Sequence, residues 1–126
     1  MIGWDPSAIA LLQLLPRTAR GPRRDGVFAL WLAVRVARGA RGGSPALERA
    51  HRRRVAALEQ RLSSLALPPP LRRALMAAVA ELMHADAMSP ARALTQLVAP
   101  ARDSAGPEAA DAVASAARAA RHGATA

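Results

Sequence analysis

Five times along this chain, a residue suited to the N-cap of a helix stands directly before a proline, and we take four of these pairs as helix starts. A capping side chain accepts a hydrogen bond from a backbone N–H of the first turn, and a proline beside it lacks an N–H that would otherwise go unpaired. Glycine is also accepted at the N-cap, although it has no side chain to cap with. The four pairs predict four helix starts: Asp5-Pro6, Ser44-Pro45, Ser89-Pro90 and Gly106-Pro107.

Prolines and glycines also predict where helices end. Proline disfavours a helical residue before it, and glycine is the usual residue just past a helix C-terminus. Three consecutive prolines at 68–70 cannot continue a helix, so they predict a short rigid polyproline corner. The expected helices run from Asp5 to about Leu15, over about 25–38, 45–66 and 71–87, from Ser89 to before Pro100, and from Pro107 to a stop at Gly123.

No segment alternates apolar and polar residues between turn signals, as a strand would. The pattern predicts an all-α protein, a compact irregular bundle of five to six short helices with an N-terminal apolar helical hairpin and one longer basic amphipathic helix. A chain of 126 residues suits one small domain. We expect residues 1–103 to form it, and residues 104–126 to be an Ala-rich C-terminal helix or a partly flexible tail.

The first two predicted helices are apolar around nearly their whole circumference. They contain AIALLQLL at residues 8–15 and VFALWLAV at residues 27–34. Helices of this kind are buried on all sides or lie in lipid, so the hairpin is the centre of the bundle, an interface with another chain, or a membrane contact. The apolar anchors expected at an interface are Trp4, Leu11, Leu12, Phe28, Trp31 and Leu32.

The longest predicted helix, 45–66, is amphipathic. At 100° per residue its apolar side chains form one stripe, with three arginines nearly opposite. We expect these arginines, Arg49, Arg52 and Arg53, to face solvent. The stripe consists of Leu47, Val55, Leu58, Leu62 and Leu65.

Two polar residues of this helix do not fit its solvated side. His51 lies inside the apolar stripe, and we expect a buried or boundary imidazole with a hydrogen-bond partner rather than a ligand. Arg54 lies on the edge of the stripe, where an unpaired buried charge would cost several kcal/mol. We expect Arg54 to extend its head to solvent, to enter an interface, or to meet a carboxylate such as Glu81 or Asp86.

The chain is strongly basic, with a formal net charge of +9, and all eighteen of its basic residues are arginine. If the loop after the first helix lies near the 45–66 helix, their arginines form one electropositive end. Such a field favours an acidic surface on a partner protein, a nucleic acid or an anionic membrane. The predicted basic patch consists of Arg17, Arg20, Arg23, Arg24, Arg49, Arg52 and Arg53.

Catalytic and cofactor motifs are lacking in the sequence. There is no cysteine, no phosphate-binding glycine loop and no nucleophile elbow. Glu81 and His84 have the i, i+3 spacing of di-iron bundle proteins, but those sites need a second such motif and further carboxylates. We expect no catalytic residue, cofactor, metal or small-molecule substrate.

These features predict a non-enzymatic small helical interaction protein: a subunit, adaptor or assembly factor that docks on a larger protein complex or self-associates. A basic nucleic-acid-binding protein is the alternative, although scarce aromatic residues disfavour base stacking. A peripheral membrane protein is the second alternative. No apolar stretch approaches the roughly 20 residues that span a bilayer, and the N-terminus lacks the pattern of a signal peptide. We therefore expect a cytoplasmic location, with membrane-peripheral as the alternative.

Overall fold

The computed structural model describes residues 5–40, 43–84 and 86–125, and in these ranges it contains helices and no strand. The all-α bundle predicted from the sequence is confirmed. The elements are α1 (Pro6–Leu14), a short 3-10 turn η1 (Leu15–Arg17), α2 (Pro22–Arg38), α3 (Pro45–Ser63), α4 (Pro69–Leu82), α5 (Ser89–Thr95), α6 (Val98–Ala105) and α7 (Pro107–Thr125).

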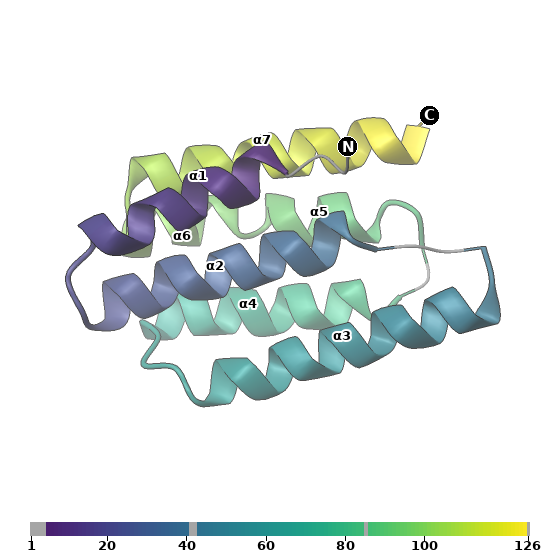
Figure 1. Cartoon of the computed structure of the whole chain (residues 1–126), viewed down its shortest axis with the longest axis horizontal. Coiled ribbons are helices and arrows are strands. Elements are labelled where there is room, and N and C mark those ends of the chain that lie inside the picture. Colours follow the sequence, from purple (N-terminus) through teal and green to yellow (C-terminus); the bar gives the residue numbers. More distant parts are fainter. Residues whose placement is uncertain (1–4, 41–42, 85, 126) are drawn as a thin grey trace.

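Helix α2 is the central element of the bundle, because it packs against each of the other six α-helices. It lies between α1 and α3, and Figure 1 shows these three helices side by side with α4 to α7. Helix α7 packs against α1, α5 and α6 as well as α2. Residues 107–125 therefore form a helix that contacts four other helices of the bundle.

Two of the four predicted helix starts show the expected side-chain cap. The Asp5 carboxylate accepts hydrogen bonds from the backbone N–H groups of Ser7 (2.8 Å) and Ala8 (3.3 Å). Ser44 Oγ accepts one from the backbone N–H of Leu47, at 3.1 Å. Gly106 precedes α7 with φ near 98°, a conformation that favours glycine.

Several predicted boundaries are wrong, most of them at a proline or a glycine. Helix α2 begins at Pro22 rather than at about residue 25, and α4 ends at Leu82 rather than at about residue 87. Pro69 and Pro70 open α4 instead of forming a separate corner. The stretch after Ser89 forms two helices, and Pro100 lies in the first turn of α6, where a missing N–H breaks no helical hydrogen bond. Gly123 lies inside α7, which continues to Thr125. Ser89 caps no helix, because it belongs to α5 and its side chain is buried.

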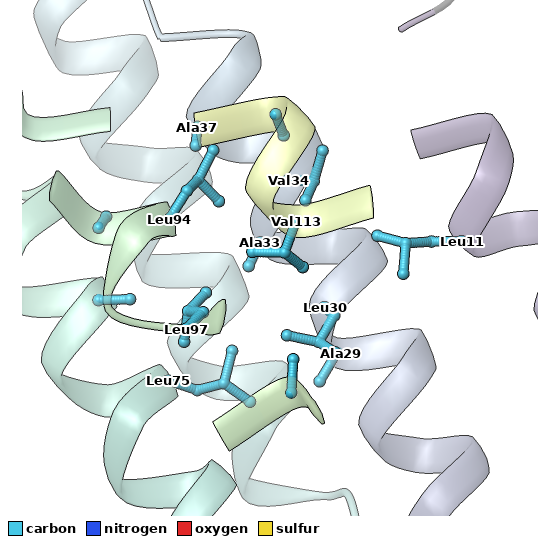
Figure 2. Close-up of a cluster of buried hydrophobic side chains, with 14 of the residues drawn as sticks. Leu11, Ala29, Leu30, Ala33, Val34, Ala37, Leu75, Leu94, Leu97 and Val113 are labelled. Atoms are coloured by element: carbon cyan, nitrogen blue, oxygen red, sulfur yellow. The ribbon is translucent and has the colours of Figure 1, made fainter. Parts of the chain in front are cut away.

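The core consists of leucine, valine and alanine side chains from all seven α-helices. Figure 2 shows its centre, where side chains from α2 meet others from α1, α4, α5 and α7. Alanine is abundant at these contacts, and its small side chain lets helices approach closely. The labelled residues include Leu11, Leu30, Ala33, Val34, Leu75, Leu94 and Val113.

The N-terminal hairpin is enclosed only in part. Helix α2 buries one broad side, which includes Val27, Leu30 and Val34. Helix α1 buries only Ser7, Ala8 and Leu11. The bundle therefore covers one side of each apolar helix and leaves the other side at the surface, so the hairpin is both part of the core and part of the exterior.

Candidate docking surface

The predicted apolar anchors divide between core and surface. Leu11 is 0% exposed, so it belongs to the core and is not available to a partner. The next residue, Leu12, is 43% exposed on the outside of α1. Trp4 lies outside the described residues. The prediction of Leu11 as an interface residue is wrong, because α1 turns that side chain toward the centre of the bundle.

The remaining anchors share the outer side of α2. Phe28, Trp31 and Leu32 are half-buried, and the spacing of three and four residues places them on one helical face. The rings of Phe28 and Trp31 lie 5.7 Å apart between centroids, at 31° to each other. Trp31 and Leu32 also pack against the buried core. This side of α2 is therefore apolar, ordered and partly open to solvent.

Two guanidinium groups lie over these aromatic rings. Arg35, one turn after Trp31 on α2, places its Cζ atom 4.9 Å from the centroid of that ring. Arg61 of α3 places its Cζ atom 5.3 Å from the centroid of Phe28. Cation–π contacts at exposed sites contribute about 0.5–1 kcal/mol each, so they favour these positions of the two arginine side chains. Arg61 therefore links α3 to the aromatic side of α2.

We call this surface the aromatic–arginine face. Arg54 belongs to it because it lies seven residues before Arg61, which places both on the same side of α3. In the part of the chain that the structure describes, no carboxylate forms an ion pair with Arg35, Arg54 or Arg61. The face consists of Phe28, Trp31, Leu32 and Arg35 of α2 with Arg54 and Arg61 of α3.

Sequence reasoning did not include Arg35 and Arg61 in the site. Arg35 could have been found, because it follows Trp31 by four residues and so lies on the same helical face. Arg61 comes from another helix, and its place over Phe28 depends on how α3 packs against α2. The same packing brings the backbone N–H of Ala66 to the Asp25 carboxylate, at 2.8 Å, so the end of α3 lies beside the start of α2.

This antiparallel arrangement separates the seven arginines of the predicted basic patch. One group lies in or next to the connection between α1 and α2, whereas the other lies on the first half of α3, at the opposite end of α2 (Figure 1). A helix of the length of α2 spans about 25 Å. The two groups therefore do not form one electropositive patch. The first holds Arg17, Arg20, Arg23 and Arg24, and the second holds Arg49, Arg52 and Arg53.

The arginines of the second group are exposed, as predicted for the solvated side of α3. Arg54 is exposed as well, so it meets neither Glu81 nor Asp86. Those two carboxylates are instead paired with Arg92, whose Nη2 atom donates to Asp86 Oδ2 at 2.8 Å and whose Nε atom donates to Glu81. The first group is partly engaged, because Arg17 forms an ion pair with Glu108 at 3.3 Å.

His51 is buried with a hydrogen-bond partner, as predicted. Its Nε2 atom lies 2.8 Å from the backbone carbonyl oxygen of Leu82, at the end of α4. A carbonyl oxygen only accepts, so Nε2 carries a proton and donates. The Nδ1 atom is buried without a partner in the described residues. His51 therefore joins α3 to α4.

The carboxyl of Asp86 has a pKa below its ordinary value of 3.8, because the backbone N–H of Met88 and the Arg92 side chain donate hydrogen bonds to its ionised form. Arg92→Ala is expected to raise this pKa part of the way back, since the Met88 hydrogen bond remains. The stabilising effect of the carboxylate is complete above pH 3.8 and is lost as the pH falls through the lowered pKa. An acid titration followed by NMR measures the Asp86 pKa in the unaltered protein and in the Arg92→Ala variant from the carboxyl chemical shifts. An Asp86 pKa of 3.8 in the unaltered protein would contradict the pairing.

A cleft of about 460 Å³ opens near the C-terminal end of α2. Its lining includes Arg52, His84 and Asp86, together with Glu48. The described residues contain no group of three or more His, Cys, Asp or Glu side chains that could hold a metal ion. Glu81 and His84 therefore gain no third ligand from the described part of the chain.

The fold defines a small bundle of short helices, and the described chain holds no helix long and apolar enough to cross a bilayer. Comparison with protein-family models, curated proteins and solved structures finds no match. The aromatic–arginine face and the distribution of charge are therefore the observations from which a function is argued.

Proposed function

We propose that the protein is a non-enzymatic helical interaction protein, a subunit, adaptor or assembly factor that docks on a larger protein complex. The observation that carries this proposal is the aromatic–arginine face. Phe28, Trp31 and Leu32 lie at the surface on the helix that also forms the centre of the bundle. Tryptophan and arginine are enriched among the residues that dominate protein–protein binding energy.

The position of the face on α2 favours specific binding. A docking surface on a helix that packs against six others is rigid, so little conformational entropy is lost when a partner binds. Leu32 and Trp31 already contact the core, which holds their side chains in place. A partner would cover apolar atoms that the chain itself leaves half-exposed.

A nucleic acid is the second candidate partner, and the charge of +9 supports it. Phosphate binding is favoured by a continuous positive track. The two arginine groups lie at opposite ends of α2, and Arg17 is paired with Glu108, so the described arginines provide less of such a track than the sequence alone suggested. Protein docking is therefore the function that we favour.

Photo-crosslinking in the native cells tests the docking face. Phe28 is replaced by p-benzoylphenylalanine, which keeps an aromatic ring at this position. Met76 of α4, 38% exposed and apolar, receives the same residue as the control. We expect one discrete protein adduct from position 28 and none from position 76. Excess purified wild-type protein is expected to compete for the adduct, and Trp31→Ala protein is expected to compete poorly.

Two results would overturn docking at this face. One is an equal pattern of adducts from positions 28 and 76, which would indicate random collision. The other is the absence of any adduct from position 28 while the protein is folded, as judged by circular dichroism.

A further inference from the structure

We propose that the aromatic–arginine face binds an acidic amphipathic helix of a partner protein, with an apolar side chain against Phe28 and Trp31 and carboxylates on Arg35, Arg54 and Arg61. This inference rests on the proposed function and specifies the chemistry of the partner. Three features of the face support it: an apolar centre, a rim of guanidinium groups and the spacing between those groups.

The charge of the face indicates the charge of the partner. Arg35, Arg54 and Arg61 have no acidic partner among the described residues, although other arginines of the chain do. Arg38, for example, is paired with Asp5 at 2.6 Å, and Arg92 is paired with Asp86. A carboxylate suits an unpaired guanidinium because it accepts two parallel hydrogen bonds from it, as a phosphate also does. The rim of the face therefore selects an acidic partner.

Two arginine side chains of the face are positioned before a partner binds. Arg35 and Arg61 lie over aromatic rings, so two long side chains are held near the apolar centre before any partner arrives. Neither guanidinium donates a hydrogen bond to another described residue, so their N–H groups remain available. Fixing a side chain in advance lowers the entropy lost on binding. The same contacts keep positive charge directly beside the apolar surface.

The spacing of the arginines on α3 indicates the shape of the partner. Arg54 and Arg61 are seven residues apart on α3, or about 10.5 Å along the helix axis. Carboxylates at positions i and i+7 of a partner helix have the same separation. Apolar residues at i+3 and i+4 then lie between them on the same face, as in helices that dock into apolar grooves.

The geometry disfavours the other occupants. Single-stranded nucleic acid binds by stacking its bases flat on ring faces, and each of these two rings already has a guanidinium group of the chain itself over one face. A second copy in a symmetric contact would bring arginines against arginines, since such a contact uses the same surface on both chains. A protein helix with carboxylates meets neither obstacle.

Titration with a designed peptide tests this inference. The peptide is a helix of about 18 residues with Glu at i and i+7 and Leu at i+3 and i+4. The fluorescence of Trp31, in a Trp4→Phe background, reports binding as a saturable blue shift. A control peptide of the same composition has its two Glu at i+2 and i+9, which keeps their spacing but places them on the side of the helix opposite the two Leu. It is expected to bind at least about tenfold more weakly, since it cannot present both features on one face.

Matched variants identify the arginines. Arg54→Gln combined with Arg61→Gln is expected to weaken binding by at least about tenfold, because both carboxylate contacts are lost. Arg52→Gln, an exposed arginine on the other side of α3, is expected to leave binding unchanged. Binding is also expected to weaken as salt rises from about 50 to 500 mM, because screening reduces the attraction between exposed charges.

Three results would overturn the proposal. They are equal binding of both peptides, equal weakening by the Arg52 variant and the double variant, and tighter binding of a single-stranded thymidine oligonucleotide or anionic phosphatidylserine vesicles than of the peptide. If the photo-crosslink from position 28 forms but the peptide does not bind, the docking function stands and the acidic helix is wrong. If the crosslink fails and the peptide does not bind, both proposals fail.

Discussion

Replacing Leu11 with alanine is expected to lower the free energy of unfolding by about 2–5 kcal/mol, the range measured for buried leucines. Leu11 is 0% exposed and faces the centre of the bundle, so the truncation leaves a cavity among packed side chains. The same change at the adjacent Leu12, 43% exposed, is expected to cost under about 1 kcal/mol. Urea denaturation followed by circular dichroism measures both values.

The pair of variants tests how the apolar helix α1 is oriented. Both residues have the same chemistry and neighbouring positions, so helix propensity affects them equally. If Leu12→Ala costs as much as Leu11→Ala, then α1 does not present one side to α2 and α7 as the structure describes. If neither substitution has an effect, α1 is not docked on the bundle.

Replacing Ala116 with aspartate is expected to lower the free energy of unfolding by at least about 3 kcal/mol, because the new carboxylate would be buried without a partner. Ala116 is 0% exposed, in the middle of α7, where this helix contacts its neighbours. Ser115→Asp places the same group at the adjacent exposed position and is expected to cost under about 1 kcal/mol.

Denaturation and hydrogen exchange of α7 amides together measure this effect. We expect Ala116→Asp to lower the midpoint of unfolding and to speed exchange throughout α7, and Ser115→Asp to do neither. If neither variant changes the midpoint of unfolding or the exchange of α7 amides, then residues 104–126 act as a loosely attached tail. The sequence left this open, because the alanines of the segment form only a weak apolar stripe.

Local signals predicted much of the secondary structure. Asp5 and Ser44 cap the helices that follow them, because a cap needs only the side chain and the next few backbone N–H groups. Two of the errors share one cause. A proline is accepted in the first turn of a helix and disfavoured deeper inside it, so Pro69 and Pro100 were compatible with a helix start as well as with a helix stop.

The candidate site was predicted in part. Phe28, Trp31 and Leu32 were predicted as apolar anchors because aromatic residues dominate interfaces, and the structure places the three half-buried on one face of α2. The division of the α1 leucines between core and surface could not be predicted, because a helix that is apolar all round has no preferred side. The sequence does not distinguish Leu11 from Leu12, and only the packing of the neighbouring helices buries one of them.

The sequence by itself determined that this chain forms short helices, where most of them begin, and which side of the basic α3 helix meets water, because these depend on side chains within a few residues of one another. The tertiary structure alone decided which side of α1 is buried, that Arg61 lies over Phe28, and that the arginines form two separate groups. Those features depend on the antiparallel packing of α2 and α3, which places residues far apart in the chain side by side and residues of one predicted patch at opposite ends of a helix.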